Sequence, residues 1–210
     1  MGSPKIMKQQ IDQKIAEGYD CIKIKIGALE FKLECELLEY VRSNFDTNLV
    51  LRVDANGAFK PEEASSKLKS LCQFDLHSIE QPISPGQWDI MRELSNASMV
   101  PVALDEELIG IQDKQKEALL DSTKPRYLVL KPTLLGGVRE TRRWIELAEE
   151  KKIGWWITSA LESNVGLNVL TQFASELSVT SHQGLGTGNL YENNIPRGMT
   201  IKNGFIYNQV

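Results

Sequence analysis

Residues 49–57 read Leu-Val-Leu-Arg-Val-Asp-Ala-Asn-Gly. The apolar residues before Asp54, together with the turn-forming pair Asn56-Gly57 after it, predict a short buried strand. Asp54 stands at the carboxyl end of that strand, where parallel α/β folds gather ligands and chemistry. A carboxylate at this depth is costly unless it is paired or bound to a metal. The stretch therefore predicts a parallel strand with a functional group at its end.

The same arrangement recurs along the chain. Strand-like runs end in a polar residue, and a stretch with apolar residues at helical spacing follows each of them. The end residues succeed one another at steps of 25 to 29 residues: Lys25, Asp54, Glu80, Asp105, Lys131 and Ser159. A strand, two loops and a covering helix need about this length, which indicates parallel strands joined by helical crossovers.

These six strand ends favour a closed ring. An open doubly wound sheet could share the period, but its site would use only the strands beside a switch point. The predicted fold class is therefore α/β, a (β/α) TIM-like barrel. Seven strands are expected, over 19–27, 49–54, 75–80, 100–105, 126–131, 154–159 and 178–182. Because a helix over 5–17 comes before them, we expect the barrel to be incomplete at its N-terminus, without its first strand.

The chain is expected to divide near residue 190. Residues 1–190 would form the barrel catalytic domain, and 191–210 a C-terminal extension. In that extension Asn203-Gly204 lies between apolar pairs, which predicts a β-hairpin.

Composition limits the class of protein. A chain of 210 residues with 41% hydrophobic and 25% charged residues is ordinary for one soluble globular domain. Its net charge of −4 gives no reason to expect nucleic acid or an anionic membrane as a partner. It has no signal-like N-terminus or long apolar run, so we expect the cytoplasm. Three scattered cysteines argue against a disulfide framework or a zinc site.

Three strand-end carboxylates predict a metal site. Asp54, Glu80 and Asp105 would repel one another unless a hard divalent cation lay between them, and oxygen-only ligands favour Mg²⁺ or Mn²⁺. Lys25 and Lys131 would flank that cation, and a lysine pushed towards its neutral form can act as a base. This set suits removal of a proton next to the carboxylate of a small-molecule substrate.

Simpler interpretations exist for the individual residues. A single acidic residue at a strand end is commonly a helix N-cap or a solvated loop residue, but three at one repeat, bracketed by lysines, are more specific. Lys23 is either a partner of the ligands or a structural lysine. His77 and His182 are interpreted as core or loop histidines.

At this point the sequence resembles the enolase superfamily, muconate-lactonizing subgroup, over nearly the whole chain. The resemblance implies Asp54, Glu80 and Asp105 as Mg²⁺ ligands, with Lys25 and Lys131 as the acid/base pair. The mandelate racemase branch is disfavoured because no strand-end His-Asp pair replaces Lys131. The motifs that carry the resemblance are Lys23-Ile-Lys25, Asp54-Ala-Asn56, Glu80-Gln-Pro82, Asp105-Glu-Glu107 and Lys131-Pro132.

Within the subgroup, residues 51–56, 159–166 and 184–188 are similar to the o-succinylbenzoate synthases of menaquinone biosynthesis. These enzymes dehydrate a cyclohexadiene carboxylate by syn elimination. The resemblance implies that Lys25 moves the proton and that Lys131 stays charged against the ring face. It implies support of the ligands by Arg52 and Asn56, and substrate-carboxylate binding by Ser159, Gly184 and Gly186.

Two alternatives stay open. N-acylamino-acid racemisation could use the same residues, whereas dipeptide epimerisation is disfavoured because Gly184-Leu185-Gly186 stands where epimerases carry Asp-x-Asp. The family also carries an N-terminal capping domain, towards which the C-terminal hairpin would pack. The chain is expected to lack that cap, so the second alternative is a catalytically silent, metal-binding barrel fragment. The sequence does not indicate the oligomeric state.

Overall fold

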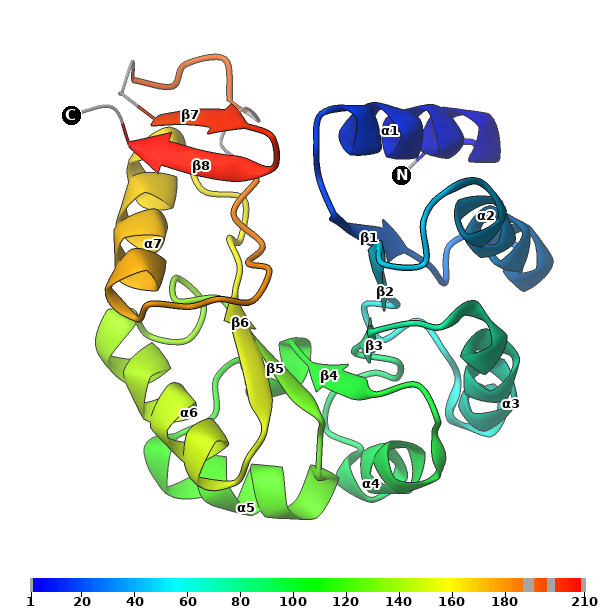
Figure 1. The fold of residues 1–210 in the computed structure, drawn as a ribbon. Coiled ribbons are helices and arrows are strands. Elements are labelled where there is room, and N and C mark those ends of the chain that lie inside the picture. Colours follow the sequence, from blue (N-terminus) through cyan, green and yellow to red (C-terminus); the bar gives the residue numbers. More distant parts are fainter. Residues whose placement is uncertain (1, 187–190, 196–198, 209–210) are drawn as a thin grey trace.

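The computed structural model describes residues 2–186, 191–195 and 199–208. Within them, six parallel strands pair in chain order and curve into an open arc (Figure 1). This confirms the predicted α/β fold, an incomplete TIM-like barrel. The strands are β1 (Cys21–Lys25), β2 (Val50–Asp54), β3 (Ser78–Glu80), β4 (Val102–Leu104), β5 (Tyr127–Leu130) and β6 (Gly154–Ile157).

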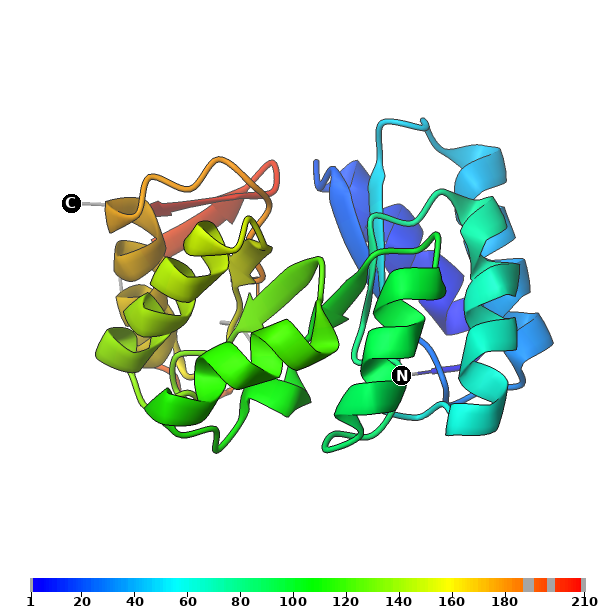
Figure 2. The same ribbon diagram turned by 90° about the horizontal axis from the view of Figure 1, so that it is seen from below.

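An outer layer of helices covers the convex side of the arc (Figures 1 and 2). Ser3 caps the first of them, and Pro61 is the first residue of the third. The helices are α1 (Pro4–Ala16), α2 (Phe31–Asn44), α3 (Pro61–Leu71), α4 (Trp88–Ala97), α5 (Asp113–Thr123), α6 (Val138–Glu150) and α7 (Asn164–Glu176), with short 3₁₀ helices η1 (Cys72–Phe74) and η2 (Glu106–Leu108). None of the described helices is both long and apolar enough to cross a membrane.

Alternation along the strands separates the core from the site. Ile22, Ile24, Leu51 and Val53 belong to the large hydrophobic cluster that lies between strands and helices. The residues between them face the concave side, because side chains alternate along a strand. The concave side therefore carries the charged residues, above a second small cluster of Ala103, Val129 and Trp156.

The prediction of a strand over 178–182 is wrong. Ser178 takes a left-handed conformation with φ +52°, and within the described residues the sheet continues past β6 only as an isolated bridge from Thr158 to Gly184. In a sheet with a further strand beside β6, the Ile157 amide would donate to a backbone carbonyl of that strand. Here it donates instead to Gln183 Oε1 at 2.7 Å. Glycine is required at 184, since a Cβ there would lie 2.2 Å from Thr158 Oγ1.

The predicted hairpin is present, as antiparallel β7 (Met199–Lys202) and β8 (Phe205–Asn208). Its turn residues Asn203 and Gly204 have φ of +50° and +75°, as a type I′ turn requires. The turn packs against the α1–β1 connection, where a Cβ added to Gly18 would lie 2.8 Å from Asn203 Cα. The expected boundary at residue 190 lies outside the described residues.

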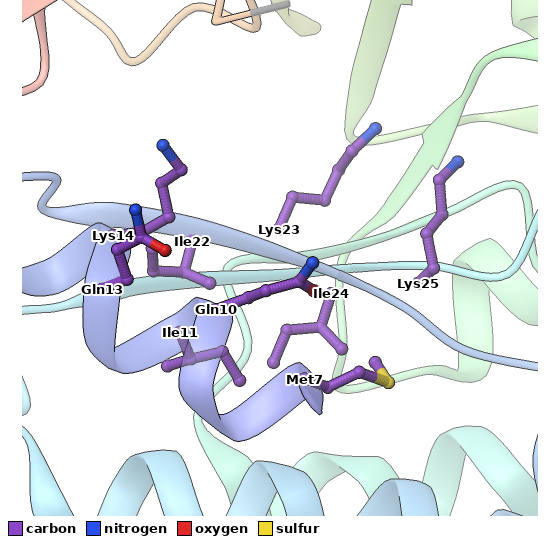
Figure 3. A pocket seen from close by; sticks show the side chains of 9 residues that line it. All are labelled: Met7, Gln10, Ile11, Gln13, Lys14, Ile22, Lys23, Ile24 and Lys25. Atoms are coloured by element: carbon purple, nitrogen blue, oxygen red, sulfur yellow. The ribbon is translucent and has the colours of Figure 1, made fainter. Parts of the chain in front are cut away.

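A groove runs along the outer edge of β1. The cavity, about 390 Å³, lies between that edge and α1, and its lining includes Met7, Ile11 and Lys14 of the helix. Lys23 and Lys25 project from β1 away from Met7 and Ile11 (Figure 3). Among the described residues, β1 pairs only with β2, so this groove is where a further strand could pair.

Candidate active site

Three buried carboxylates stand at the carboxyl ends of β2, β3 and β4. Asp54 pairs in register with Glu80, whereas Glu80 pairs with Ala103, so Asp105 lies two residues further along its own strand. Residues two apart on a strand share a face, and tilted barrel strands require such a stagger. The structure thus brings together the three predicted ligands, whose exposures are only 0%, 1% and 1%.

Lysines neutralise these carboxylates. Lys23 Nζ lies 3.0 Å from Asp54 Oδ2 and 3.0 Å from Glu80 Oε2, so that one ammonium bridges two strands. Lys25 Nζ lies 2.5 Å from the same Asp54 oxygen, and Lys131 forms an ion pair with Asp105. The two predicted acid/base lysines therefore contact opposite ends of the cluster.

The carboxyl groups differ in how they titrate. Burial raises the pKa of Glu80 well above its usual range, and nearby Asp54 and Asp105 raise it further against the opposing charge of Lys23. Burial also acts to raise the pKa of Asp54, but Lys23 and Lys25 outweigh it and hold that pKa below its usual value. Burial alone would lower the pKa of Lys23, yet Glu80 and Asp54 hold it above its usual value. Of Asp54 and Glu80, Glu80 is thus the carboxyl that more readily keeps a proton.

The donor set fits a hard divalent cation. Its oxygens are buried, lie on adjacent strands and need positive charge, and the Lys23 ammonium supplies that charge between Asp54 and Glu80. In the described part of the chain, no three acidic, histidine or cysteine side chains are already gathered around one point as metal ligands. The carboxylates are turned towards lysines, and a divalent cation would have to displace these ion pairs.

Asn56 joins the cluster, while Arg52 lies beneath it. Asn56 Oδ1 accepts a hydrogen bond from Lys25 Nζ at 2.6 Å, and its Nδ2 donates to Glu106 Oε1 at 2.7 Å. Arg52 is buried, with its guanidinium 3.9 Å from the Trp156 ring centre and Nη1 donating to a backbone carbonyl. Asn56 therefore supports Lys25 directly, and Arg52 supports the floor of the site.

The predicted substrate-binding residues meet only in part. The Ser159 amide donates to the Gly184 carbonyl at 3.0 Å, so these two residues adjoin beyond β6. Gly186 is exposed and lies near the Tyr19 hydroxyl of the α1–β1 turn. Residues 187 and 188 of the same glycine-rich loop lie outside the described residues.

Both histidines have structural surroundings. His77 stacks on Tyr127 with ring centres 4.6 Å apart, and burial lowers its pKa to about 4, helped by the positive charges of Arg52 and His182. His182 Nε2 lies 2.9 Å from Asp20 Oδ1, which joins the chain beyond α7 to the turn before β1.

Sequence reasoning missed the residues that hold the strand ends together. Gln81 and Glu107 form a buried hydrogen-bonded pair between the ends of β3 and β4, and Glu106 contacts Asn56 after β2. Each directly follows, or comes two residues after, a predicted ligand. That adjacency was the available signal, but the sequence does not reveal that these side chains turn towards one another.

Comparison with known proteins identifies the family. Residues 6–208 match the family described as "Enolase C-terminal domain-like". The chain belongs to this family. It is 51% identical over 207 residues to o-succinylbenzoate synthase of Desulfotalea psychrophila, an alignment that covers 98% of this chain and 56% of the relative. It is 29% identical to o-succinylbenzoate synthase of Bacillus subtilis, covering 95% of the chain and 53% of the relative.

Two solved structures agree with the fold. MenC from Desulfotalea psychrophila superposes with a TM-score of 0.92 at 50% identity, covering 98% of this chain and 57% of that one. The L-Ala-D/L-Glu epimerase from Bacillus subtilis has a TM-score of 0.88 at 19% identity, covering 100% and 58%, and shows the fold alone. The chain thus spans about half the length of the relatives it matches.

Proposed function

We propose that this chain carries the catalytic barrel of a Mg²⁺-dependent dehydratase of the o-succinylbenzoate synthase type. The observation that carries the proposal is that two lysines contact the two ends of one buried carboxylate cluster, Lys25 at Asp54 and Lys131 at Asp105. The 51% identical relative named o-succinylbenzoate synthase supports the choice of reaction. The substrate would be a small-molecule cyclohexadiene carboxylate, in the cytoplasm, and Mn²⁺ could replace Mg²⁺.

The lysines would carry the proton. Lys25 Nζ takes the proton from the carbon next to the substrate carboxylate, and the electrons of that C–H bond form the new ring double bond. The neighbouring C–O bond breaks, and Lys25 returns the proton to the departing hydroxide, which leaves as water. Lys131 keeps its proton and places its charge against the ring face. When bound, Mg²⁺ would stabilise the negative charge that develops on the substrate carboxylate.

Release of Lys25 is the step that the cluster can control. Lys25 shares Asp54 Oδ2 with Lys23, so any cation that engages this oxygen competes with both ammonium groups. Loss of that attraction would free the Lys25 side chain from Asp54 and leave it available to the substrate. The hydrogen bond from Lys25 Nζ to Asn56 Oδ1 does not involve Asp54, so it would still direct the Lys25 amine towards the cluster.

A racemase of N-acylamino acids is the second candidate. Two lysines that approach one site from different strands could remove a proton on one face and return it on the other. Among the relatives, an L-Ala-D/L-Glu epimerase of Francisella tularensis is 25% identical over 174 residues, covering 82% of this chain and 48% of that one. The third candidate is a silent fragment that binds a divalent cation without turnover.

The first experiment is a spectrophotometric dehydration assay on the 210-residue chain with the cyclohexadiene substrate and Mg²⁺. Aromatisation creates a new ultraviolet absorbance, and we expect turnover that a chelator and Lys25→Ala both abolish. Lys14→Ala is the matched control, because Lys14 lines the β1 groove and pairs with the exposed Glu17 instead of the cluster. Racemised N-acylamino acid without absorbance change would favour the second candidate. Folded, Mg²⁺-binding protein that turns over neither substrate would favour the third.

A further inference from the structure

Glu107 is a buried carboxylate outside the catalytic cluster. It lies in η2, directly after β4, and its exposed fraction is 3%. Its Oε1 accepts hydrogen bonds from the Gly86 amide and from Trp88 Nε1, both at 2.8 Å, and its Oε2 accepts one from Gln81 Nε2 at 3.1 Å. Neutral N–H donors thus hold this carboxylate, although burying an apolar or amide side chain at the same place would cost less desolvation free energy.

Gln81 is the central member of this network. It is fully buried, has a left-handed φ of +40°, and uses both ends of its amide. Its Oε1 accepts from the backbone amides of Asp105 and Glu107, each at 3.2 Å, and its Nε2 donates to the Ile83 carbonyl at 3.0 Å as well as to Glu107. One side chain therefore ties the end of β3 to the first residues after β4.

The network lies directly behind two proposed ligands. Glu80 precedes Gln81, and Asp105 precedes η2, so the tie fixes the backbone separation of two strand ends that carry mutually repelling carboxylates. The same short helix also reaches β2, because Glu106 Oε1 accepts a hydrogen bond from Asn56 at 2.7 Å. Three consecutive strand ends are thus linked through η2.

We propose that Gln81 and Glu107 are positioning residues that hold Glu80 and Asp105 at the spacing needed to bind one divalent cation. The proposal rests on the metal site of the proposed function. Residues that orient metal ligands in this way commonly change metal affinity 10- to 100-fold when they are altered. Lys25 and Lys131 form their hydrogen bonds with Asp54, Asn56 and Asp105 and with neither of these two residues, so the effect should appear in cation binding before it appears in chemistry.

The test measures Mn²⁺ binding by the full chain, with free Mn²⁺ followed by electron paramagnetic resonance. Glu107→Gln turns an amide donor towards the Gln81 donor, and we expect a dissociation constant roughly 10- to 100-fold larger than wild type. Glu34→Gln is the matched control. Glu34 is equally buried at 3% and accepts three backbone amide hydrogen bonds in the loop over 27–29, without contact to a ligand. We expect it to bind Mn²⁺ within about threefold of wild type.

A polarity swap distinguishes positioning from general damage. In the double variant Gln81→Glu with Glu107→Gln, the donor and acceptor between these two side chains exchange, while the contact to the Ile83 carbonyl is lost. We expect it to recover part of the affinity that Glu107→Gln loses. If Glu107→Gln does not fold, Trp88→Phe removes one donor to Glu107 and should weaken Mn²⁺ binding about 2- to 5-fold.

The outcomes are separable. Any of four results would overturn the positioning role. They are wild-type Mn²⁺ affinity in folded Glu107→Gln, wild-type affinity in Trp88→Phe when that variant replaces it, a loss of affinity in Glu34→Gln equal to that in Glu107→Gln, and no recovery of affinity in the double variant. Wild-type protein that binds no Mn²⁺ would overturn the metal site of the proposed function, and the positioning role with it. Selective loss with partial recovery would support both.

Discussion

In the protein without a bound metal, the Lys23 ammonium supplies the positive charge that a divalent cation would supply between Asp54 and Glu80. Its ammonium touches Asp54 and Glu80, both almost completely buried, while about a third of its own side chain remains exposed. Removing one partner of a buried ion pair is costly because an uncompensated charge stays behind. From the sequence, Lys23 could be either a partner of the predicted metal ligands or a structural lysine. Its contacts with Asp54 and Glu80 show that it belongs to the carboxylate cluster.

Lys23→Met should lower the free energy of unfolding at pH 7 by about 2 kcal/mol without divalent cations, a value reduced for the partial exposure of Lys23. Urea denaturation measures it, and saturating Mg²⁺ should restore part of the loss. Lys14→Met is the control, because Lys14 pairs with the exposed Glu17 and its loss should change stability by less than about 0.5 kcal/mol. Equal stability of the two variants would contradict this role of Lys23.

His77 should make the protein less stable in mild acid. Its pKa is lowered to about 4 by burial, with Arg52 and His182 adding to the effect, whereas in the unfolded chain it titrates near 6.5. Below about pH 6.5, His77 binds a proton in the unfolded state but stays neutral in the folded state. The free energy of unfolding therefore falls as the pH drops towards 4. Between pH 7 and pH 5 the loss from this residue should be about 2 kcal/mol.

The measurement for His77 is urea unfolding of wild type and His77→Phe at both pH values. The phenylalanine ring can keep the stack on Tyr127 but cannot titrate. The acid-induced loss should therefore be smaller in the variant by about 2 kcal/mol. An identical pH dependence in both proteins would show that His77 is protonated in the folded state.

Among the elements, the hairpin has the least expected position. Its turn meets the α1–β1 connection, so the last part of the described chain packs on one of the first turns (Figure 1). Met199 and Ile206 pack against the main core from this hairpin. Its packing towards a capping domain, expected from the family resemblance, remains a prediction.

Gly18→Ala and Gly86→Ala form a matched pair that tests this contact. The two glycines have nearly the same φ, +88° and +87°, so the backbone strain of an alanine should be similar, about 1 kcal/mol. A Cβ at Gly18 meets Asn203 Cα at 2.8 Å, whereas a Cβ at Gly86 meets nothing within 4 Å. Thermal or urea unfolding should show Gly18→Ala to be less stable than Gly86→Ala by about 1–3 kcal/mol. Equal losses would show that the hairpin does not dock there.

At the scale of the whole molecule, the sheet remains an open arc with an edge at β1. The Val50 amide donates to the Asp20 carbonyl, and the Ile26 amide donates to the Asp54 carbonyl. Along a parallel strand, the backbone amides and carbonyls of successive residues point alternately to the two sides. Those of the even-numbered residues of β1 therefore bond to β2, and those of the odd-numbered residues point towards the groove. Such an edge is a place where another strand can add.

Hydrogen exchange can test this edge. The Lys23 amide should exchange at least about 100-fold faster than the Ile24 amide, since only the latter faces β2. Neighbouring amides of β2, such as Arg52 and Val53, are the control, because this part of β2 has a partner strand on each side and both amides should be protected. Strong protection of Lys23 in a dilute sample would show that something covers the edge, a second copy of the chain included.

Most elements followed from local patterns, and the exceptions have physical causes. A short apolar run followed by Asn56-Gly57 predicted the strand that ends at Asp54, and Asn203-Gly204 predicted the hairpin, because both signals lie within a few residues. The strand over 178–182 failed because its pairing depends on β6, where Gln183 and Gly184 take the bonds instead. The grouping of Asp54, Glu80 and Asp105 was predictable because parallel strands bring their ends to one edge.

The sequence by itself determined the strand–helix units, their order and the residue types at the strand ends, since these depend on periodicities of two and of about 3.6 residues. Only the tertiary structure decided which of those groups touch. Lys23 bridges residues 31 and 57 positions away, Gln81 meets Glu107 across 26 positions, and His182 reaches Asp20 across 162. Such contacts depend on how strands are staggered and how the arc curves, and no local pattern carries that information.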